Sequence, residues 1–312
     1  MPCTRVTAAE GRIYSDDKSN IYPPPAQIFL LLIKTKSGRP ARFEQEIHYL
    51  CTPTNTLPSI HMKTAEQIIL AMRAAADDSR RQVLERFFKT GPGEYGEGDR
   101  FLGLPVPLTR AFVKKIGTDI SFEEIEILAD SPWHEVRLAA FLLLVEQMKA
   151  ATPSPKRSPL MYAARRSEIA EFYLRIARKA NNWDLVDLAC YKVLGSYLTQ
   201  PDASGKMPDN TILDRLAAST DLWEQRIAIV STLAFIRKGD TSVTMRIADL
   251  LLPHPHDLIH KAVGWMLREA GKRNPAALDA YLEANSAKMH RTALRYAIER
   301  LPEAERKAWL AR

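Results

Sequence analysis

One pattern runs through most of this chain and limits its possible folds more than any other feature. From Met62 onward, apolar residues recur at spacings of three and four, as they do along one face of an α-helix. No segment alternates convincingly between apolar and polar residues, so no β-strand is expected. The segments predicted to be helical are 65–76, 79–89, 107–116, 121–129, 133–149, 161–179, 183–198, 208–217, 221–237, 243–251, 256–271, 275–284, 289–300 and 303–311.

The short connections between these helices favour antiparallel pairs stacked side by side over one globular bundle. A loose internal repeat supports the stack, because five helices carry a charged residue followed by small apolar residues. The intervals between these charged residues are 50, 39, 35 and 30, in the range of a degenerate HEAT-like repeat. We therefore predict an all-α fold, a HEAT-like helical-repeat solenoid. The aligned charged residues are Arg137, Asp187, Arg226, Lys261 and Arg291.

The beginning of the chain differs from the rest in composition. Residues 1–61 hold 7 of the 20 prolines and 2 of the 3 cysteines, without a sustained period. Thr64 followed by Gln67 then predicts a helix start with a capping box. We predict an N-terminal extension over 1–61 and one repeat domain over 62–312. A disordered tail and a mis-assigned start codon explain the extension equally well.

Composition and charge exclude several classes of protein. With 46% hydrophobic and 26% charged residues the chain can bury a core, so global disorder is excluded. Its net charge of +7 favours an anionic partner. The longest apolar run, Ile28–Ile33, is too short to cross a membrane. Three scattered cysteines provide neither a disulfide framework nor a closed zinc site, which favours a cytoplasmic protein without a metal.

The repeat alignment also predicts a binding surface. Equivalent residues of a solenoid lie along one face, so the aligned residues form a mostly cationic stripe suited to a phosphate backbone. Asp187 is the exception in that stripe. Either it has a separate chemical task, or it pairs with a neighbouring arginine and holds adjacent repeats together.

Four of the five tryptophans border this stripe. Trp183 lies four residues before Asp187, and Trp265 lies four residues after Lys261. Trp133 and Trp223 stand beside Arg137 and Arg226 in the same way. Tryptophan at helical spacing is often a core residue, but four of them beside one charged row suit the binding of sugars and bases.

Three motifs in the second half of the chain resemble those of one known family. They resemble the DNA alkylation repair family, the AlkD-type alkylpurine DNA glycosylases, and the likeness extends from about residue 75 to the C-terminus. Further similarity lies at S-P-W-H-E-V-R (131–137) and at 291–300. The motifs are N-N-W-D-L-V-D (181–187) with L-G-S-Y-L (194–198), L-W-E-Q-R-I-A (222–228) and K-A-V-G-W-M-L-R-E (261–269).

The resemblance implies a C-shaped solenoid that holds duplex DNA in its concave groove and excises N3- or N7-alkylated purines. It implies that Asp187 is the catalytic carboxylate, that Trp183 and Trp265 lie near the deoxyribose of the lesion, and that Arg226 contacts DNA. The stripe adds Arg137, Lys261, Arg291 and Trp223 as predicted DNA-binding residues. No cofactor, membrane or obligate protein partner is expected, and a monomer suffices.

A single carboxylate suits this chemistry. An N3- or N7-alkylated purine is cationic and leaves as a neutral base, so it needs little help from a general acid. Positive charge develops on the deoxyribose instead, as in glycoside hydrolysis. A carboxylate such as Asp187 can stabilise that charge and orient the attacking water.

One segment departs from the family pattern. Gly91–Asp99 is a glycine-rich insertion, where known glycosylases of the family carry a short helix that touches the lesion. The insertion puts substrate recognition in doubt more than DNA binding. Two alternatives stay open for this loop. Either Glu94 and Tyr95 reach DNA from its tip, or the loop is exposed and has no function.

Two rival functions stay open at this stage. The first is a catalytically silent relative that binds DNA with the same cations, and the second is a protein-interaction scaffold, since most HEAT arrays bind proteins.

Two local motifs do not predict a further site. The glycines at 91, 93 and 96 spell a dinucleotide fingerprint without the required strand. His254, His256 and His260 are interpreted as surface residues at a helix start.

Overall fold

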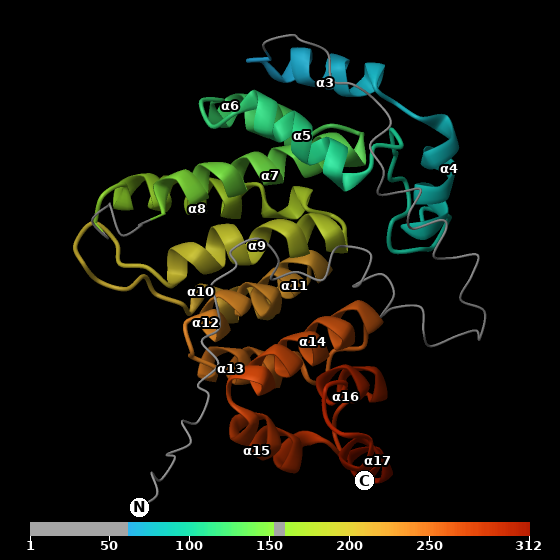
Figure 1. The fold of residues 1–312 in the computed structure, drawn as a ribbon, viewed down its shortest axis with the longest axis vertical. Helices are drawn as coiled ribbons and strands as arrows, with labels where there is room; N and C mark the ends of the chain where they lie inside the picture. The colour runs from blue at the N-terminus through green and yellow to red at the C-terminus, as the bar shows by residue number, and fades with distance from the viewer. Residues whose placement is uncertain (1–61, 153–159) are drawn as a thin grey trace, which may run out of the picture. The chain divides into compact units, whose positions relative to one another are not determined.

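A computed structural model describes residues 62–152 and 160–312. The predicted extension over 1–61 lies outside these residues. Within the described ranges every regular element is a helix, and the only bridge of the β type joins Arg100 to Trp133 (Figure 1). The predicted all-α architecture is therefore confirmed.

The first described helices follow the predicted pattern closely. Helix α3 (Ala65–Ala74) begins with the expected capping box, in which the side chains of Thr64 and Gln67 each bind the other's backbone N–H. Three further helices follow, α4 (Asp78–Phe87), α5 (Val106–Ile116) and α6 (Phe122–Ala129). Asp77 and Ser121 cap α4 and α6, as short polar side chains do at helix starts.

The rest of the chain continues in helices joined by short connections. They are α7 (His134–Ala151), α8 (Ala163–Arg175), the 3-10 turn η1 (Ala177–Lys179), α9 (Trp183–Leu198), α10 (Ile212–Ala217), α11 (Leu222–Ser231), α12 (Leu233–Arg237), α13 (Ser242–Leu251), α14 (Asp257–Arg273), α15 (Pro275–Asn285), α16 (Arg291–Ala297) and α17 (Glu303–Ala311).

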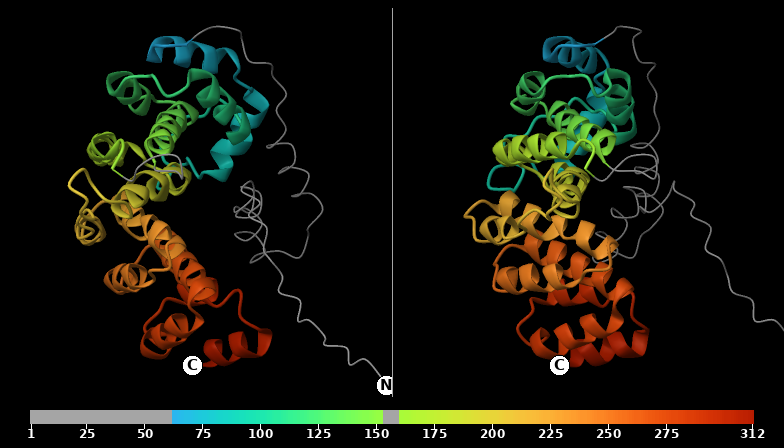
Figure 2. Two further views of the ribbon diagram at one scale, coloured as in Figure 1. Left: turned by 60° about the vertical axis from the view of Figure 1, so that its left-hand side comes forward. Right: turned by 90° about the vertical axis from the view of Figure 1, so that its left-hand side faces the viewer.

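These helices stack in sequence order. Helix α7 packs on α9, α9 on α11, α11 on α14, and α14 on α16. A second row covers this inner row, with α6 on α7, α8 on α9, α10 on α11 and α13 on α14. Figures 1 and 2 show the succession along the long axis. The predicted solenoid of stacked helix pairs is confirmed by this arrangement.

Most predicted helices differ from the structure by a few residues at their ends, and three of them differ by a break or a late start. The segment 161–179 divides at Ile176 into α8 and η1, and α10 begins at Ile212 rather than at residue 208. The segment 221–237 divides at Thr232, whose hydroxyl donates to the Ile229 carbonyl at 2.7 Å. A threonine that bonds back to its own helix bends it, which explains why α11 and α12 are separate.

Helix α7 lies in the middle of the stack and is buried on nearly every side. Apolar residues therefore surround its axis, unlike those of a surface helix, which follow one stripe. Among the described ranges no helix is both long and apolar enough to cross a membrane.

Candidate functional site

The aligned charged residues all lie near the beginnings of inner helices. Arg137, Asp187, Arg226 and Lys261 each lie within the first five residues of α7, α9, α11 and α14, and Arg291 is the first residue of α16. The N-terminal end of a helix carries a partial positive charge. This end of the inner row is therefore electrostatically suited to an anion.

The structure pairs Asp187 with Arg226. Both groups are buried, with exposed fractions of 7% and 5%. The Arg226 Nε donates to Asp187 Oδ1 at 2.8 Å, and its Nη2 donates to Oδ2 at 2.7 Å. This two-pronged ion pair joins α9 to α11, so the pairing with a neighbouring arginine that the sequence left open is present.

The same guanidinium also reaches the next inner helix. Its Nη1 donates to the carbonyl of Leu258 in the first turn of α14. Three of its five N–H groups are thus engaged by described residues, and two are left for another acceptor. Arg226 therefore fixes the beginnings of α9, α11 and α14 relative to one another.

Burial governs the protonation of Asp187. Loss of solvent raises the pKa of this carboxyl, while the charge and hydrogen bonds of Arg226 act in the opposite direction. The nearby carboxylate of Asp184 adds to the rise. On balance the pKa of Asp187 lies above its usual value, while Arg226 holds the carboxyl group in a fixed orientation on α9.

The tryptophans near Asp187 have different environments. Trp183 is half-buried on α9 and stacks on Phe88, with ring centroids 5.4 Å apart. Trp265 is half-buried on α14, one inner helix beyond α11. Trp223 is buried and lies edge-on to the ring of Tyr95 at 6.5 Å.

Arg137 takes part in a separate buried cluster of charges. Its Nη1 donates to the Ser131 carbonyl at 2.9 Å, and its Nη2 donates to Asp99 at 2.5 Å. The predicted DNA contact of Arg137 stays a prediction. Its side chain is only 8% exposed and serves this cluster.

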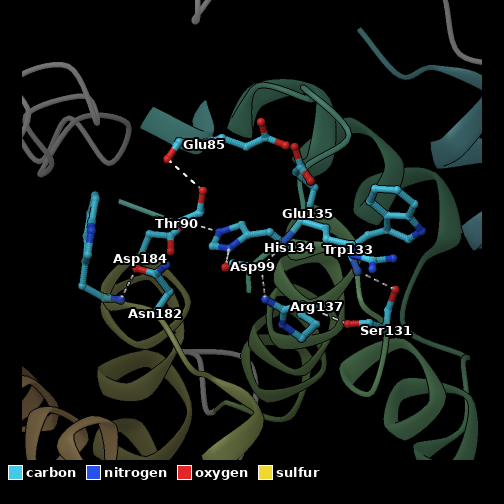
Figure 3. Close-up of polar contacts among 12 residues, drawn as sticks. Glu85, Thr90, Asp99, Ser131, Trp133, His134, Glu135, Arg137, Asn182 and Asp184 are labelled. Atoms are coloured by element: carbon cyan, nitrogen blue, oxygen red, sulfur yellow. Dashed lines mark hydrogen bonds and ion pairs between the residues drawn. The ribbon is translucent and has the colours of Figure 1, made fainter. Parts of the chain in front are cut away.

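His134 lies at the centre of the cluster, between two carboxylates (Figure 3). Its Nδ1 is 2.7 Å from Asp99 Oδ2, and its Nε2 is 2.9 Å from Asp184 Oδ2. Burial alone would lower the pKa of His134, but Asp184 and Asp99 outweigh it and raise this pKa to about 10. Despite burial, His134 and Arg137 hold the pKa of Asp99 below its usual value. The imidazole is therefore a buried cation that donates from both nitrogens.

The cluster fixes the predicted insertion. Asp99 is the last residue of Gly91–Asp99, and its side chain is only 2% exposed. Gly96 is buried where an added Cβ would lie 2.4 Å from the Phe88 carbonyl oxygen, so only glycine fits there. The residues that follow the insertion are held as well, because Glu135 on α7 accepts the backbone N–H groups of residues 102, 103 and 104 at 2.9 to 3.0 Å. The insertion is thus a fixed part of the structure.

The last two predicted cations lie farther along the stack. Lys261 forms an ion pair with Asp257 one turn before it, at 2.7 Å. Arg291 is exposed and donates to the Leu310 carbonyl in α17. The structure therefore joins Asp187, Arg226 and the start of α14 directly, whereas Arg291 lies outside that group.

The sequence interpretation did not single out Asp99, His134 or Asp184. A signal for two of them was present, because His134 and Asp184 are 50 residues apart, the same interval that separates Arg137 from Asp187. The repeat register that aligned one pair therefore also aligns the other. Asp99 lies in an irregular segment, where no helical period indicates a partner.

The remaining candidates for site chemistry are accounted for by packing. In the described ranges no three His, Cys, Asp or Glu side chains are arranged to hold a metal ion. His256 caps α14, as a helix-start residue should. His260 is buried and stacks on His290 at 3.9 Å, so its interpretation as a surface residue was wrong, because α16 packs against this face. Cys190 is fully buried in α9.

Comparison with known proteins assigns the family. The family model described as DNA alkylation repair enzyme matches residues 68–301, which is most of the chain. The chain belongs to the DNA alkylation repair family. No curated protein sequence matches it significantly.

A solved structure supports the same fold. It is described as a predicted DNA alkylation repair enzyme from Enterococcus faecalis, with a TM-score of 0.52 and 19% sequence identity. The likeness covers 73% of this chain and 97% of that one. For this member of the DNA alkylation repair family, every residue of the candidate site lies within the matched range 68–301.

Proposed function

We propose that this protein is a DNA glycosylase that hydrolyses the N-glycosidic bond of N3- or N7-alkylated purines in duplex DNA. Membership of the family supports a role in DNA repair. The observation that carries the finer proposal is the buried Asp187 carboxylate, fixed by Arg226 at the beginning of an inner helix with Trp183 one turn before it.

In the proposed reaction, the bond between the purine nitrogen and C1′ of the deoxyribose breaks. The bonding electrons go to the cationic base, which leaves as a neutral molecule. Positive charge develops on the sugar, and the Asp187 carboxylate stabilises it electrostatically. Water then adds to C1′ and releases a proton to the solvent, which leaves an abasic site for base excision repair.

Two tryptophans are proposed to assist at the sugar. An indole face attracts a nearby cation by about 0.5 to 2 kcal/mol. Trp183 and Trp265 are both half-buried, so part of each indole is accessible. We assign them to the deoxyribose of the alkylated nucleotide.

Arg226 is proposed to position Asp187 and to contact DNA through its two remaining N–H groups. Lys261 and Arg291 are proposed to contact phosphates farther along the stack, beyond Arg226, with Trp223 supporting this surface from within. Arg137 and Arg226 are the two most buried of the proposed cationic contacts, with side chains 8% and 6% exposed, and the Arg137 guanidinium already binds Asp99 and the Ser131 carbonyl.

One observation favours a second function. Both oxygens of Asp187 accept hydrogen bonds from Arg226, which partly neutralises the charge that the reaction requires. A catalytically silent protein that binds DNA with the same surface fits this pairing as well.

An assay of base release separates the two functions. Duplex DNA treated with a methylating agent is incubated with the protein, and free bases are separated by chromatography. The glycosylase releases 3-methyladenine or 7-methylguanine and leaves strands that break only after alkali. Binding to the same duplex without release of either base would contradict the proposed glycosylase and support the silent protein.

A further inference from the structure

We propose that Tyr95 is a substrate-contact residue that recognises the alkylated nucleotide by its base or deoxyribose rather than by its phosphate. This inference rests on the proposed function, because it assigns a further contact to the same site. The sequence left open whether the insertion that carries Tyr95 has a function.

The insertion is held by contacts that an idle surface loop does not require. The Asp99 carboxylate binds both His134 and Arg137, and His134 continues the bridge to Asp184 on α9. Burying several charges costs free energy even when they are paired. Such an anchor fixes the insertion relative to the helix that carries Trp183 and Asp187.

The anchored insertion places Tyr95 beside the candidate site. Its ring lies edge-on to Trp223 at 6.5 Å and an interplanar angle of 72°. Burial raises the pKa of the Tyr95 hydroxyl, while a hydrogen bond from the Trp183 side chain acts to lower it. The charges of Asp184 and Arg226 also influence this hydroxyl. Tyr95 therefore lies among residues from α9 and α11 and is still half-exposed.

The acidic residues around Tyr95 indicate which part of DNA it contacts. Glu94 and Glu97 are exposed, and they accept the backbone N–H groups of Gly91 and Gly93 at 3.0 and 2.8 Å. These carboxylates stabilise the loop and repel a phosphate backbone. Tyr95 is the aromatic side chain between them, and an aromatic ring binds a base or sugar by stacking.

The test compares Tyr95→Ala and Tyr95→Phe with the wild-type protein. The first measurement is single-turnover release of 7-methylguanine from a duplex. The second is the ratio of dissociation constants for an undamaged duplex and one with a tetrahydrofuran abasic analogue, measured by fluorescence anisotropy. Tyr162→Phe changes an exposed tyrosine at the start of α8 and serves as the matched control.

We expect Tyr95→Ala to lower base release at least tenfold and the preference for damaged duplex at least fivefold. Binding to the undamaged duplex stays within twofold, because no phosphate contact is lost. Tyr95→Phe keeps the ring and shows a smaller loss of both, even if Tyr95→Ala perturbs the loop. Tyr162→Phe behaves as the wild type.

Failure of this inference is distinguishable from failure of the proposed function. If the wild type releases no base but Tyr95→Ala still lowers the preference for damaged duplex, the glycosylase proposal fails and the Tyr95 contact stands. If both Tyr95 variants keep the wild-type preference within twofold, or the wild type has no preference, the contact is overturned.

Discussion

At the scale of single residues, a buried ion pair and a buried three-residue bridge shape the candidate site. Asp187 with Arg226 joins α9 to α11, and His134 with its two aspartates joins the insertion to α9. Removing one partner of a buried pair leaves the other charge without compensation. We therefore expect that losing one partner of either buried group lowers the free energy of unfolding more than losing one partner of a surface ion pair.

Replacing Arg226 by alanine tests this difference. The variant leaves the Asp187 carboxylate buried and unpaired, so we expect the free energy of unfolding to fall by about 3 to 5 kcal/mol. Arg178→Ala removes the exposed partner of the half-buried Glu224 and serves as control, with an expected loss of about 0 to 1 kcal/mol. Urea denaturation measures both values. Equal losses of unfolding free energy in the two variants would show that the buried pair contributes no more to stability than the surface pair.

The His134 bridge makes a prediction about pH. The pKa of His134 is about 10 in the folded protein and 6.5 for an ordinary histidine. The charged groups around it are Asp99 on the insertion, Asp184 on α9, and Glu135 and Arg137 on α7. A raised pKa means that the stabilisation is fully present below pH 6.5 and is lost as the pH rises toward 10.

We therefore expect the free energy of unfolding to decrease between pH 6.5 and about 10 in the wild type. His134→Gln is less stable at neutral pH and loses this dependence, because it cannot bind the extra proton. His290→Gln changes an exposed histidine and keeps the wild-type slope. Denaturation curves across this pH range supply the measurement, and identical slopes in His134→Gln and the wild type would refute the bridge as a charged group.

At the scale of helices, the site depends on close approach between neighbours in the inner row. A Cβ added at Gly195 on α9 would lie 2.5 Å from the Ser231 carbonyl oxygen of α11 and 2.8 Å from the Ala234 Cβ of α12. The backbone of α11 cannot yield easily to such a contact. The distance between α9 and α11 in turn sets the geometry of the Asp187–Arg226 pair.

Gly195→Ala is expected to force these helices apart and to cost about 1 to 3 kcal/mol of stability. Base release should fall as well, because the ion pair is stretched. In Gly271→Ala the closest contact is Leu278 Cδ2, the end of a flexible side chain, so the loss is smaller. Thermal denaturation and base release are measured for both variants. A larger loss of stability in Gly271→Ala than in Gly195→Ala would show that the close contact between α9 and α11 is not the more sensitive one.

The helices and the presence of the insertion were predictable from the sequence, whereas the breaks in the helices and the contacts of the insertion were not. The periodicity over 183–198 agrees with α9 residue for residue, because its burial follows the helical repeat. The break at Thr232 depends on one hydroxyl bonding to one carbonyl, which the apolar pattern does not record. The contacts of Asp99 and Tyr95 join segments far apart in the sequence, so the period of either segment gives no sign of them.

At the scale of the whole molecule, the excess of positive charge is the property that bears on DNA binding. The chain carries a net charge of +7, and the aligned charged residues lie at the positive ends of the inner helices. A protein that neutralises phosphates releases counterions, so its affinity falls as salt concentration rises. A protein-interaction scaffold is not expected to bind a duplex with an affinity that falls in this way.

Binding to an undamaged duplex at several salt concentrations tests this property. We expect the affinity to fall steeply between about 50 and 200 mM salt, with a slope reduced by about one in Lys261→Gln and in Arg291→Gln. Lys307→Gln changes an exposed lysine on α17 that pairs with Glu303, and its slope should equal that of the wild type. Affinity independent of salt would favour the scaffold.

Single-turnover release of 7-methylguanine by the wild type and by Asp187→Asn tests whether the Asp187 carboxylate takes part in base release. Asparagine keeps the shape of the side chain but carries no charge to stabilise the sugar cation. Glu224→Gln removes a half-buried carboxylate that pairs with the exposed Arg178, and it controls for loss of an ion pair. We predict at least a hundredfold slower release by Asp187→Asn at saturating protein, with a Glu224→Gln rate near that of the wild type. Release by a folded Asp187→Asn at the wild-type rate would show that the Asp187 carboxylate does not stabilise the sugar cation.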